Sequence, residues 1–291
     1  MNDRLLTVLH QRHELRQALR GHLLDHGFLE VETPVRVPAP ALEDYVDAIP
    51  AHGAWLRTSP ELHMKRLLAA GADRIFQLGP CFRLGEHGRR HRSEFTMLEF
   101  YQARVDYREL LRFTEGLVRH AATALNRPLA APGPWEILTV HDAFARHAGT
   151  TPELALAQDR FERVLVEAVE PHLGATVPTF LIDYPAALGA LARLKPGQPH
   201  LAERWELYVR GIELANAFSE LTDPDEQRRR FMATAELRRR DGREVYPLDE
   251  AFLATLARMP PAAGCALGVD RLLMVLTGAT DIAAVLPFGD E

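Results

Sequence analysis

Apolar residues recur at helical spacing in several parts of the chain. Between residues 3 and 26, a long helix is predicted by the spacing of Leu5, Leu9, Leu15, Leu19 and Leu23, and Gly27 ends it. The same periodicity, with capping residues at some starts, predicts further helices. These are expected over residues 107–126, near 140–148 and 157–172, after Ser59 and Pro60, and from Asp223-Pro224 to about Arg240.

Alternation of apolar and polar residues predicts the strands. One hairpin combines an apolar approach at residues 75–78, a polar loop rich in arginine, and the run EFTMLEFY at 94–101. If that run is a strand, Phe95, Glu99 and Tyr101 share one face with Met97. Taken alone, the hairpin is equally compatible with a solvated basic loop that binds nothing. Other strands are expected at FLEVETPV (28–35), at Thr179–Tyr184 and in the final unit CALGVDRLLMVLTG.

A second polar strand is predicted within RWELYVRGIELANAFSELTDPDEQ. Alternation places Asn216, Phe218 and Glu220 on one face, whereas Glu213 falls out of phase. A β-bulge between Glu213 and Asn216 would bring all four to one site. Carboxylates on a half-buried strand are costly unless they bind something, so a ligand site is favoured over a solvated edge.

Composition indicates an ordinary globular α+β protein. The chain has 291 residues, of which 47% are hydrophobic and 25% charged, enough for one large domain over residues 1–291. The stretch of about 127–200 shows no chemical motif and is expected to be an inserted, mainly structural region. No apolar run reaches the length of a membrane span, and the N-terminus is too charged for a signal peptide, so a cytoplasmic protein is expected.

Cysteine content and charge narrow the function further. Cys81 and Cys265 lack partners at metal spacing, so buried thiols are expected. A net charge of −6 argues against nucleic-acid binding across the surface. The arginine runs at 228–230 and 238–240 are interpreted as solvated helix faces.

The polar residues suit a nucleotide and a cationic amino acid in one site. Arg83, Arg271, His91 and the loop arginines supply cations for a polyphosphate. Glu213 and Glu220 are candidates for Mg²⁺, a hard cation that takes carboxylate and phosphate oxygens together. No P-loop or dinucleotide motif offers a competing phosphate site. The remaining groups are Phe95 for stacking a base, and Glu61, Glu99 and Tyr101 for ammonium groups, although Glu61 also suits a simple helix-capping role.

Five segments together resemble the class II aminoacyl-tRNA synthetases, and specifically the lysyl-tRNA synthetase branch. FLEVETPV resembles motif 1, FRLGEHGRRHRSEFTMLEFY motif 2, and ALGVDRLLM motif 3. TSPELHMKRLL and GIELANAFSELTDP resemble the lysine-site segments. Motif 1 begins so early that no anticodon-binding domain is expected. This compact form is similar to the elongation factor P lysine ligases, paralogues that attach (R)-β-lysine to a lysine of that factor.

The resemblance implies an antiparallel sheet flanked by helices, a homodimer formed through motif 1, and roles for individual residues. Arg83 would bind the α-phosphate, while Phe95 and Arg271 would enclose adenine, which makes the two arginines the implied catalytic residues. Glu213 and Glu220 would hold Mg²⁺. The implied ATP-binding residues are Arg83, Leu84, Gly85, Glu86, His91, Arg92, Phe95, Glu213, Leu214, Gly268 and Arg271. The implied amino-acid-binding residues are Ser59, Pro60, Glu61, Glu99, Tyr101, Asn216, Phe218, Glu220 and Ala266.

Three positions depart from the synthetase pattern. Gly85 stands where motif 2 has a glutamate, with Glu86 next to it, and Arg92 replaces an asparagine expected at ATP. Ala266 replaces a glycine of motif 3, and its methyl group should narrow the floor of the amino-acid site. A narrower floor favours a β-amino acid over α-lysine.

The implied reaction has two steps and uses ATP and Mg²⁺. The amino acid forms an adenylate with ATP, and a lysine side chain of elongation factor P then attacks it, giving an amide and AMP. Binding of tRNA is not expected, because neither an RNA-binding domain nor a broad basic face is evident. The alternatives are a lysyl-adenylate enzyme serving tRNA or another acceptor, and a silent regulator; the presence of Arg83, Arg271, Glu213 and Glu220 disfavours the latter.

Overall fold

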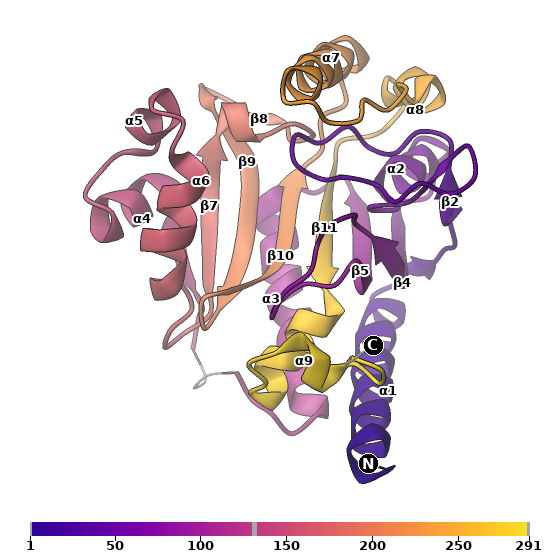
Figure 1. Cartoon of the computed structure of the whole chain (residues 1–291), viewed down its shortest axis with the longest axis vertical. Helices are drawn as coiled ribbons and strands as arrows, with labels where there is room; N and C mark the ends of the chain where they lie inside the picture. The colour runs from indigo at the N-terminus through magenta and orange to yellow at the C-terminus, as the bar shows by residue number, and fades with distance from the viewer. Residues whose placement is uncertain (1, 130–132, 290–291) are drawn as a thin grey trace.

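One large sheet organises the protein (Figure 1). The structure is a computed structural model that describes residues 2–129 and 133–289. Within these residues, nine strands form the sheet in the order β1-β4-β5-β11-β10-β9-β7-β6, with β8 paired to β9. Their bounds are β1 Leu29–Glu30, β4 Arg74–Phe82, β5 Glu94–Ala103, β6 Glu136–Thr139, β7 Thr179–Pro185, β8 Leu194–Lys195, β9 Gln198–Val209, β10 Ile212–Ser219 and β11 Ala262–Gly268.

The pairing is mainly antiparallel, with parallel pairs only at β1–β4 and β6–β7 among the described strands. The expected antiparallel sheet flanked by helices is therefore confirmed. A separate two-stranded ribbon joins β2 to β3. Its strands are β2 Arg36–Val37 and β3 Trp55–Leu56.

Helices cover the sheet on one face and at both ends (Figure 1). Helices α1, α3 and α9 pack with the apolar strand residues into the largest buried cluster. Helices α2, α7 and α8 enclose a second apolar cluster, and α4–α6 enclose a third beside β7. The helix bounds are α1 Asn2–Asp25, α2 Glu61–Ala69, α3 Tyr107–Ala124, α4 Val140–His147, α5 Pro152–Ala157, α6 Phe161–Val164, α7 Pro224–Arg240, α8 Glu250–Leu256 and α9 Val269–Thr277.

Most of the long predicted elements are confirmed, and the differences lie at their ends. The strand predicted at 28–35 shortens to β1, and the chain then turns away toward β2. Helix α2 begins at Glu61, one residue after Pro60, yet the Ser59 hydroxyl still accepts a hydrogen bond from the Glu61 N–H at 2.9 Å. The helix expected over 157–172 is broken into α, π and 3₁₀ segments, with Pro171 in the last of them. Helices α5 and α8 were not predicted.

The region of about 127–200 contributes three strands, β6, β7 and β8, to the main sheet, and β9 begins within it. β7 is buried along its whole length and pairs with β9, and β6 pairs with β7 at the sheet edge. Residues 130–132 of this region lie outside the described residues. The region thus shares the core of the sheet, and it brings Tyr184 toward the polar face described below.

The interpretation of the α7 arginines as solvated is wrong at two positions. Arg238 is fully buried and donates to the carbonyl oxygens of Glu43, Val46 and Glu244. Arg230 donates to carbonyl oxygens of the turn at 189–192. Both side chains reach backbone acceptors contributed by distant loops, which a local charge pattern does not reveal.

Both cysteines are free and buried, as predicted. Burial raises the pKa of Cys81 to about 12, so the thiol stays protonated. In the described part of the chain, no helix is both long enough and apolar enough to cross a bilayer.

Candidate active site

Strand register places a row of polar side chains across the open face of the sheet. Ala266 on β11 pairs with Glu99 on β5 and with Asn216 on β10, and Asn216 in turn pairs with Glu206 on β9. Directly paired residues point to the same face, so these four side chains stand in line. The alternate residues point to the opposite face and belong to the apolar core with α1, α3 and α9. One face of the sheet is thus the core and the other carries the site.

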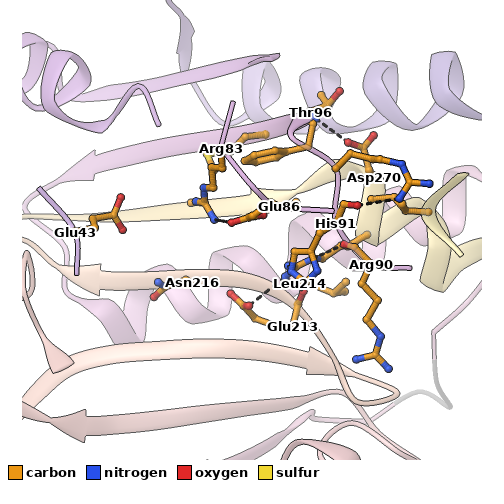
Figure 2. Close-up of a pocket in the computed structure, with 17 residues that line it drawn as sticks. Glu43, Arg83, Glu86, Arg90, His91, Thr96, Glu213, Leu214, Asn216 and Asp270 are labelled. Carbon is orange, nitrogen blue, oxygen red and sulfur yellow. Dashed lines mark hydrogen bonds and ion pairs between the residues drawn. The ribbon is translucent and has the colours of Figure 1, made fainter. Parts of the chain in front are cut away.

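A cavity opens over this row (Figure 2). Its walls come from β5, β10 and β11, the loop between β4 and β5, and the start of α9. The structure brings together most of the predicted ATP-binding residues here. Those that line it are Arg83, Glu86, His91, Arg92, Phe95, Glu213, Leu214, Gly268 and Arg271, and two residues predicted for the amino acid, Asn216 and Ala266, line it as well.

Arg83 lines the cavity and keeps one donor without a partner among the described residues. Its guanidinium lies 5.1 Å from the centre of the Phe95 ring, and its Nη1 is 3.3 Å from a Glu86 oxygen. The buried Nε atom has no hydrogen-bond partner among the described residues. Burial opposes its charge, but Glu43 and Glu86 outweigh burial and raise the pKa of Arg83. A permanent cation with a free donor suits an anionic ligand.

Arg271 lies at the other end of the cavity, in the first turn of α9. Its Nη1 donates to the backbone oxygen and to the carboxylate of Glu213, at 3.0 and 3.1 Å. Its Nη2 donates to His91 Nε2 at 2.5 Å. Burial and the Arg271 charge both lower the pKa of His91, so its ring is the neutral acceptor of this bond.

Asp270 anchors the arginine end and was missed by the sequence interpretation. Its carboxylate accepts from Arg12 Nη1 at 2.6 Å and from the Thr96 N–H at 2.7 Å. Arg12 also donates to the Thr96 hydroxyl at 3.0 Å. These bonds tie α1, β5 and α9 together directly beneath the cavity, so Asp270 positions the strand that carries Phe95.

The residues predicted for the amino acid form a buried cluster beside this cavity. Glu99 accepts hydrogen bonds from the Ser59 hydroxyl at 2.7 Å and from the Tyr101 hydroxyl at 2.5 Å. Burial raises the pKa of Glu99 to about 7, and the charge of Glu61 adds to the shift. The carboxylate of Glu99 therefore titrates near neutral pH.

Lys65 completes this cluster, although its position in the sequence suggested only a continuing helix. Its ammonium lies 2.5 Å from a carboxylate oxygen of Glu61 and 2.5 Å from one of Glu220, and 5.2 Å from the Phe218 ring centre. Burial lowers the pKa of Lys65, but the two carboxylates outweigh burial and raise it overall. Glu61 and Glu220, both predicted to bind the amino acid, therefore already hold one ammonium, which the chain itself supplies.

Gly264 makes room for this cluster. A Cβ atom at this position would lie 2.2 Å from the Tyr101 ring and 2.5 Å from a Glu220 oxygen. Any larger residue would push the phenol and the carboxylate apart.

The structure does not bring together the two carboxylates predicted to share Mg²⁺. Glu213 and Glu220 stand near opposite ends of β10, about 20 Å apart at the rise of a β-strand. Glu220 is engaged by Lys65, and Glu213 by Arg271. In residues 2–129 and 133–289, no group of three or more His, Cys, Asp or Glu side chains is arranged to hold a metal.

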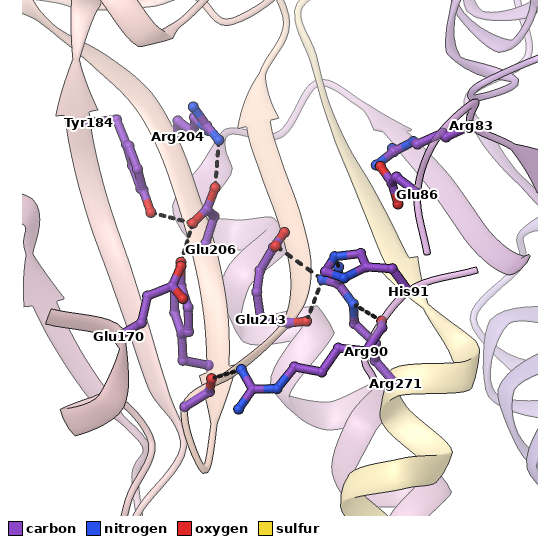
Figure 3. Close-up of polar contacts among 12 residues, drawn as sticks. Arg83, Glu86, Arg90, His91, Glu170, Tyr184, Arg204, Glu206, Glu213 and Arg271 are labelled. Atoms are coloured by element: carbon purple, nitrogen blue, oxygen red, sulfur yellow. Dashed lines mark hydrogen bonds and ion pairs between the residues drawn. The ribbon is translucent and has the colours of Figure 1, made fainter. Parts of the chain in front are cut away.

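Glu206 is a better candidate than Glu220 to share Mg²⁺ with Glu213 (Figure 3). The sequence pattern did not single out Glu206. Burial raises the pKa of Glu206; Arg204 opposes the shift and the charge of Glu213 adds to it. Mg²⁺ needs only one or two carboxylates when phosphate oxygens complete its shell. A pair of mutually repelling carboxylates beside the cavity fits that requirement. The bulge predicted near Glu213 is present, between Glu213 and Ala215.

Tyrosines from β7 and β9 hold Glu206 in place (Figure 3). The hydroxyls of Tyr184 and Tyr208 donate to one of its oxygens at 2.5 and 2.6 Å, and Arg204 donates to the other at 2.5 Å. Tyr184 belongs to the region that was expected to be mainly structural.

A few predicted ATP-binding residues have other roles. Leu84 is exposed, and its N–H donates to the Asp47 carbonyl; neither Leu84 nor Gly85 lines the cavity. Gly85 has a φ of +79°, which explains glycine at this turn, and places Glu86 beside Arg83 instead. Arg92 lines the cavity but donates to the Gly88 carbonyl, so it also braces the loop.

Comparison with known proteins agrees with this geometry. Residues 1–291 match the family described as tRNA synthetases class II (D, K and N). A lysine–tRNA ligase from Azoarcus sp. is 36% identical over 322 residues, covering 99% of this chain and 64% of the relative. Lysine–tRNA ligases from Moorella thermoacetica and Dehalococcoides mccartyi are 36% and 38% identical, covering 99% and 95% of this chain and 66% and 63% of theirs. The chain thus spans somewhat less than two thirds of these curated relatives.

Proposed function

Since the chain belongs to the class II tRNA synthetases (D, K and N), we propose that it is an ATP-dependent ligase that activates a lysine-like amino acid as its adenylate. The amino acid is (R)-β-lysine, and the acceptor is a lysine side chain of elongation factor P. The observation that carries this proposal is the arrangement of two unlike sites on one sheet face. An arginine-lined cavity adjoins a buried cluster of three carboxylates and a phenol.

In the first step, the carboxylate of the amino acid attacks the α-phosphorus of ATP and pyrophosphate leaves. The cationic guanidinium of Arg83, which lines the ATP cavity, would stabilise the charge that develops on the α-phosphate. Phe95 and Arg271 enclose the adenine, and His91 orients Arg271. Mg²⁺, held by Glu206 and Glu213, would neutralise phosphate charge. The chain contributes mainly positioning, which is the larger part of such catalysis.

The carboxylate cluster supports a substrate with two ammonium groups. Glu99 carries hydroxyl donors from Ser59 and Tyr101 and gains a full charge when a cation approaches. Lys65 offsets one charge of Glu61 and Glu220, which leaves the equivalent of two negative charges in the ionised cluster. We infer that these charges receive the two ammonium groups.

Ala266 supports a β-amino acid over α-lysine. Its methyl group lies in the row between Glu99 and Asn216, on the floor that joins the ammonium cluster to the ATP cavity. The volume of this methyl group displaces the place that the carboxylate of the substrate amino acid can occupy. The longer spacing between amine and carboxylate in a β-amino acid suits that shift.

The partner, assembly and location follow as proposals. Elongation factor P is the acceptor, tRNA is not, and the enzyme acts as a homodimer in the cytoplasm. Two free, buried thiols are usual in a reducing compartment. Exposed apolar side chains on α1 and around β1 support the dimer; they are Leu6, Leu9, Leu24, Leu29 and Val35.

The test measures ATP–pyrophosphate exchange with (R)-β-lysine and with α-lysine, followed by the intact mass of elongation factor P. Strong exchange with the β-amino acid and a mass gain of one lysyl group on the factor are expected. Arg271→Ala should abolish the exchange and leave the oligomeric state unchanged. Exchange with α-lysine alone, with charging of tRNA, would favour the lysyl-tRNA alternative. No exchange with either amino acid would overturn the ligase assignment.

A further inference from the structure

A second cavity lies next to the ATP cavity and meets it at Glu43 and Asn216. It is bounded by the loop at 43–46, the start of α6, the turn at 187–192, and strands β9 and β10. Its volume of about 220 Å³ is several times the roughly 30 Å³ share of a water molecule. Figure 2 shows Glu43 and Asn216 at the end of the ATP cavity that is remote from Asp270.

The walls of the second cavity combine apolar surface with negative charge. Leu188, Leu191 and Phe218 are among its apolar walls, and Glu43, Asp44 and Glu162 supply carboxylates. Its lining has one cation, Arg204, within the described residues. That guanidinium is already bonded to Glu206, to the Leu188 carbonyl and to Asn216, at 2.5, 2.7 and 3.1 Å. The cavity therefore suits a long aliphatic group that ends in a positive charge.

A buried clamp fixes the loop that carries two of these carboxylates. Arg238 on α7 donates to the carbonyls of Glu43 and Val46 and to the Asp47 carboxylate, at 2.7, 3.0 and 2.6 Å. The Ala48 N–H donates to the Tyr246 hydroxyl at 2.7 Å. The clamp holds the backbone and leaves the side chains of Glu43 and Asp44 without a hydrogen bond from any described residue. Burial raises the pKa of Glu43, which makes its carboxylate a stronger proton acceptor.

We propose that the second cavity is the channel for the acceptor, and that it admits the primary amine of a lysine side chain on a protein. Asp44 and Glu162 attract the ammonium at the mouth, and Glu43 receives it where the two cavities meet. The 3′ end of an RNA is disfavoured, because its phosphates would face three carboxylates. This inference rests on the proposed function and adds the path and chemical class of the acceptor.

Transfer at the junction requires the acceptor nitrogen to be neutral. The acceptor ammonium gives one proton to the Glu43 carboxylate and becomes a neutral amine. Its nitrogen attacks the carbonyl carbon of the adenylate, a C–N bond forms, and the C–O bond to phosphate breaks. AMP leaves with the electron pair of that bond, and the second proton of the nitrogen passes to water. The products are an amide and AMP.

The experiment separates the two steps of the reaction. Two variants alter the channel away from the ATP cavity: Ala187→Trp, at an exposed wall position, and the double variant Asp44→Asn/Glu162→Gln. Adenylate formation is followed by ATP–pyrophosphate exchange and by trapping with hydroxylamine, a small neutral nucleophile. Transfer is followed with Nα-acetyl-lysine methylamide as the acceptor. Ala145→Trp, at an exposed position on α4 outside the cavity, is the matched control, and circular dichroism monitors folding.

Both channel variants should lower kcat/KM for the lysine derivative by about ten-fold or more, as expected for a blocked path or lost charge pairing. Exchange and hydroxylamine trapping should stay close to wild type, and Ala145→Trp should match wild type throughout. Unchanged transfer in both variants would overturn the channel. The channel assignment would also be overturned if the wild-type protein charged tRNA and Ala187→Trp blocked that charging. Failure of the proposed function is distinct, since wild type would then show no exchange.

Discussion

Glu99 shows how burial at the residue scale converts an ordinary carboxylate into a group that titrates near neutrality. Its folded-state pKa of about 7 exceeds the usual value of 4.5 because burial penalises the charge. The folded protein therefore holds this proton more tightly than the unfolded chain. The contribution of Glu99 to the free energy of unfolding is therefore smallest above pH 7, where its charge is buried without a ligand. In the same pH range the charged carboxylate binds an ammonium group most tightly.

Affinity for the amino acid should accordingly rise with pH. KM for (R)-β-lysine in the exchange reaction should fall between about pH 6 and about pH 8 with an apparent pKa near 7. Glu99→Gln should remove this dependence and raise KM about ten-fold at pH 8, since a charged hydrogen bond is lost. Glu94→Gln, an exposed position on the same strand, should retain the wild-type profile. A profile that Glu99→Gln leaves intact would assign the titration to another group.

Lys65 should be the most costly lysine to replace. Lys65→Met leaves Glu61 and Glu220 buried without their cation, and we expect a loss of about 3 kcal/mol in the free energy of unfolding, measured by urea denaturation. The loss should grow as pH rises and the carboxylates ionise. Lys195→Met is the control, because Lys195 pairs with Asp183 at 2.6 Å but is partly exposed, and should cost about 1 kcal/mol or less. Equal losses would contradict a special role for the buried ammonium.

The residues of the ATP cavity were largely predictable, because motif positions on one strand face share their direction. Phe95 and Asn216 followed from alternation along their strands, and Glu213 followed once the bulge was assumed. Glu206 and Lys65 were missed for a common physical reason. Each has a decisive partner on a distant segment, Glu220 for Lys65 and Tyr184 for Glu206, and neither a strand pattern nor a helix pattern reveals such contacts.

At the scale of elements, α7 acts as a support for a distant loop. Its arginine run looked like a solvated face because charge runs usually are. Yet Arg238 lies under the loop at 43–48, where backbone carbonyls accept its donors. The periodicity of α7 was predictable, and the destination of its side chains was not, since that depends on a loop about 190 residues away.

Arg238→Gln should loosen that loop. Removing the guanidinium leaves buried carbonyl groups without donors, so we expect about 3 kcal/mol lower stability and faster amide hydrogen exchange at residues 43–48. Arg240→Gln, three quarters exposed on the same helix, should leave both quantities near wild type. Amide hydrogen exchange at residues 43–48 that is unchanged in Arg238→Gln would contradict the clamp.

At the scale of the whole molecule, five of the thirteen exposed large apolar side chains of the described residues lie on α1 and around β1, where the dimer is proposed. Leu9 on α1 is 45% exposed and Leu29 on β1 is 62% exposed. Such side chains on neighbouring elements are usual at the contacts between subunits. The position of motif 1 was predicted from the sequence, but the exposure of these side chains is visible only in the folded structure.

Analytical ultracentrifugation of the wild-type protein should show a dimer, and introducing glutamates at the proposed interface should disrupt it. The double variant Leu9→Glu/Leu29→Glu should shift the protein to the monomer, because it would bury four carboxylates in a symmetric contact. Leu154→Glu, which is 50% exposed on α5, should remain dimeric. A wild-type monomer at micromolar concentration would contradict the dimer.

Lys65 and Lys195 are the only lysines among the 34 basic residues of the chain, and both ammonium groups are held in ion pairs. An acyl-adenylate that escapes its site reacts with any neutral amine that it meets. Arginine does not lose its proton under such conditions, so a surface built on arginine gives the reactive product almost nothing to attack. We expect the enzyme to resist self-acylation. After prolonged incubation with ATP and amino acid, peptide mapping should find Lys65 and Lys195 unmodified, and acylation of either would show that ion pairing does not protect it.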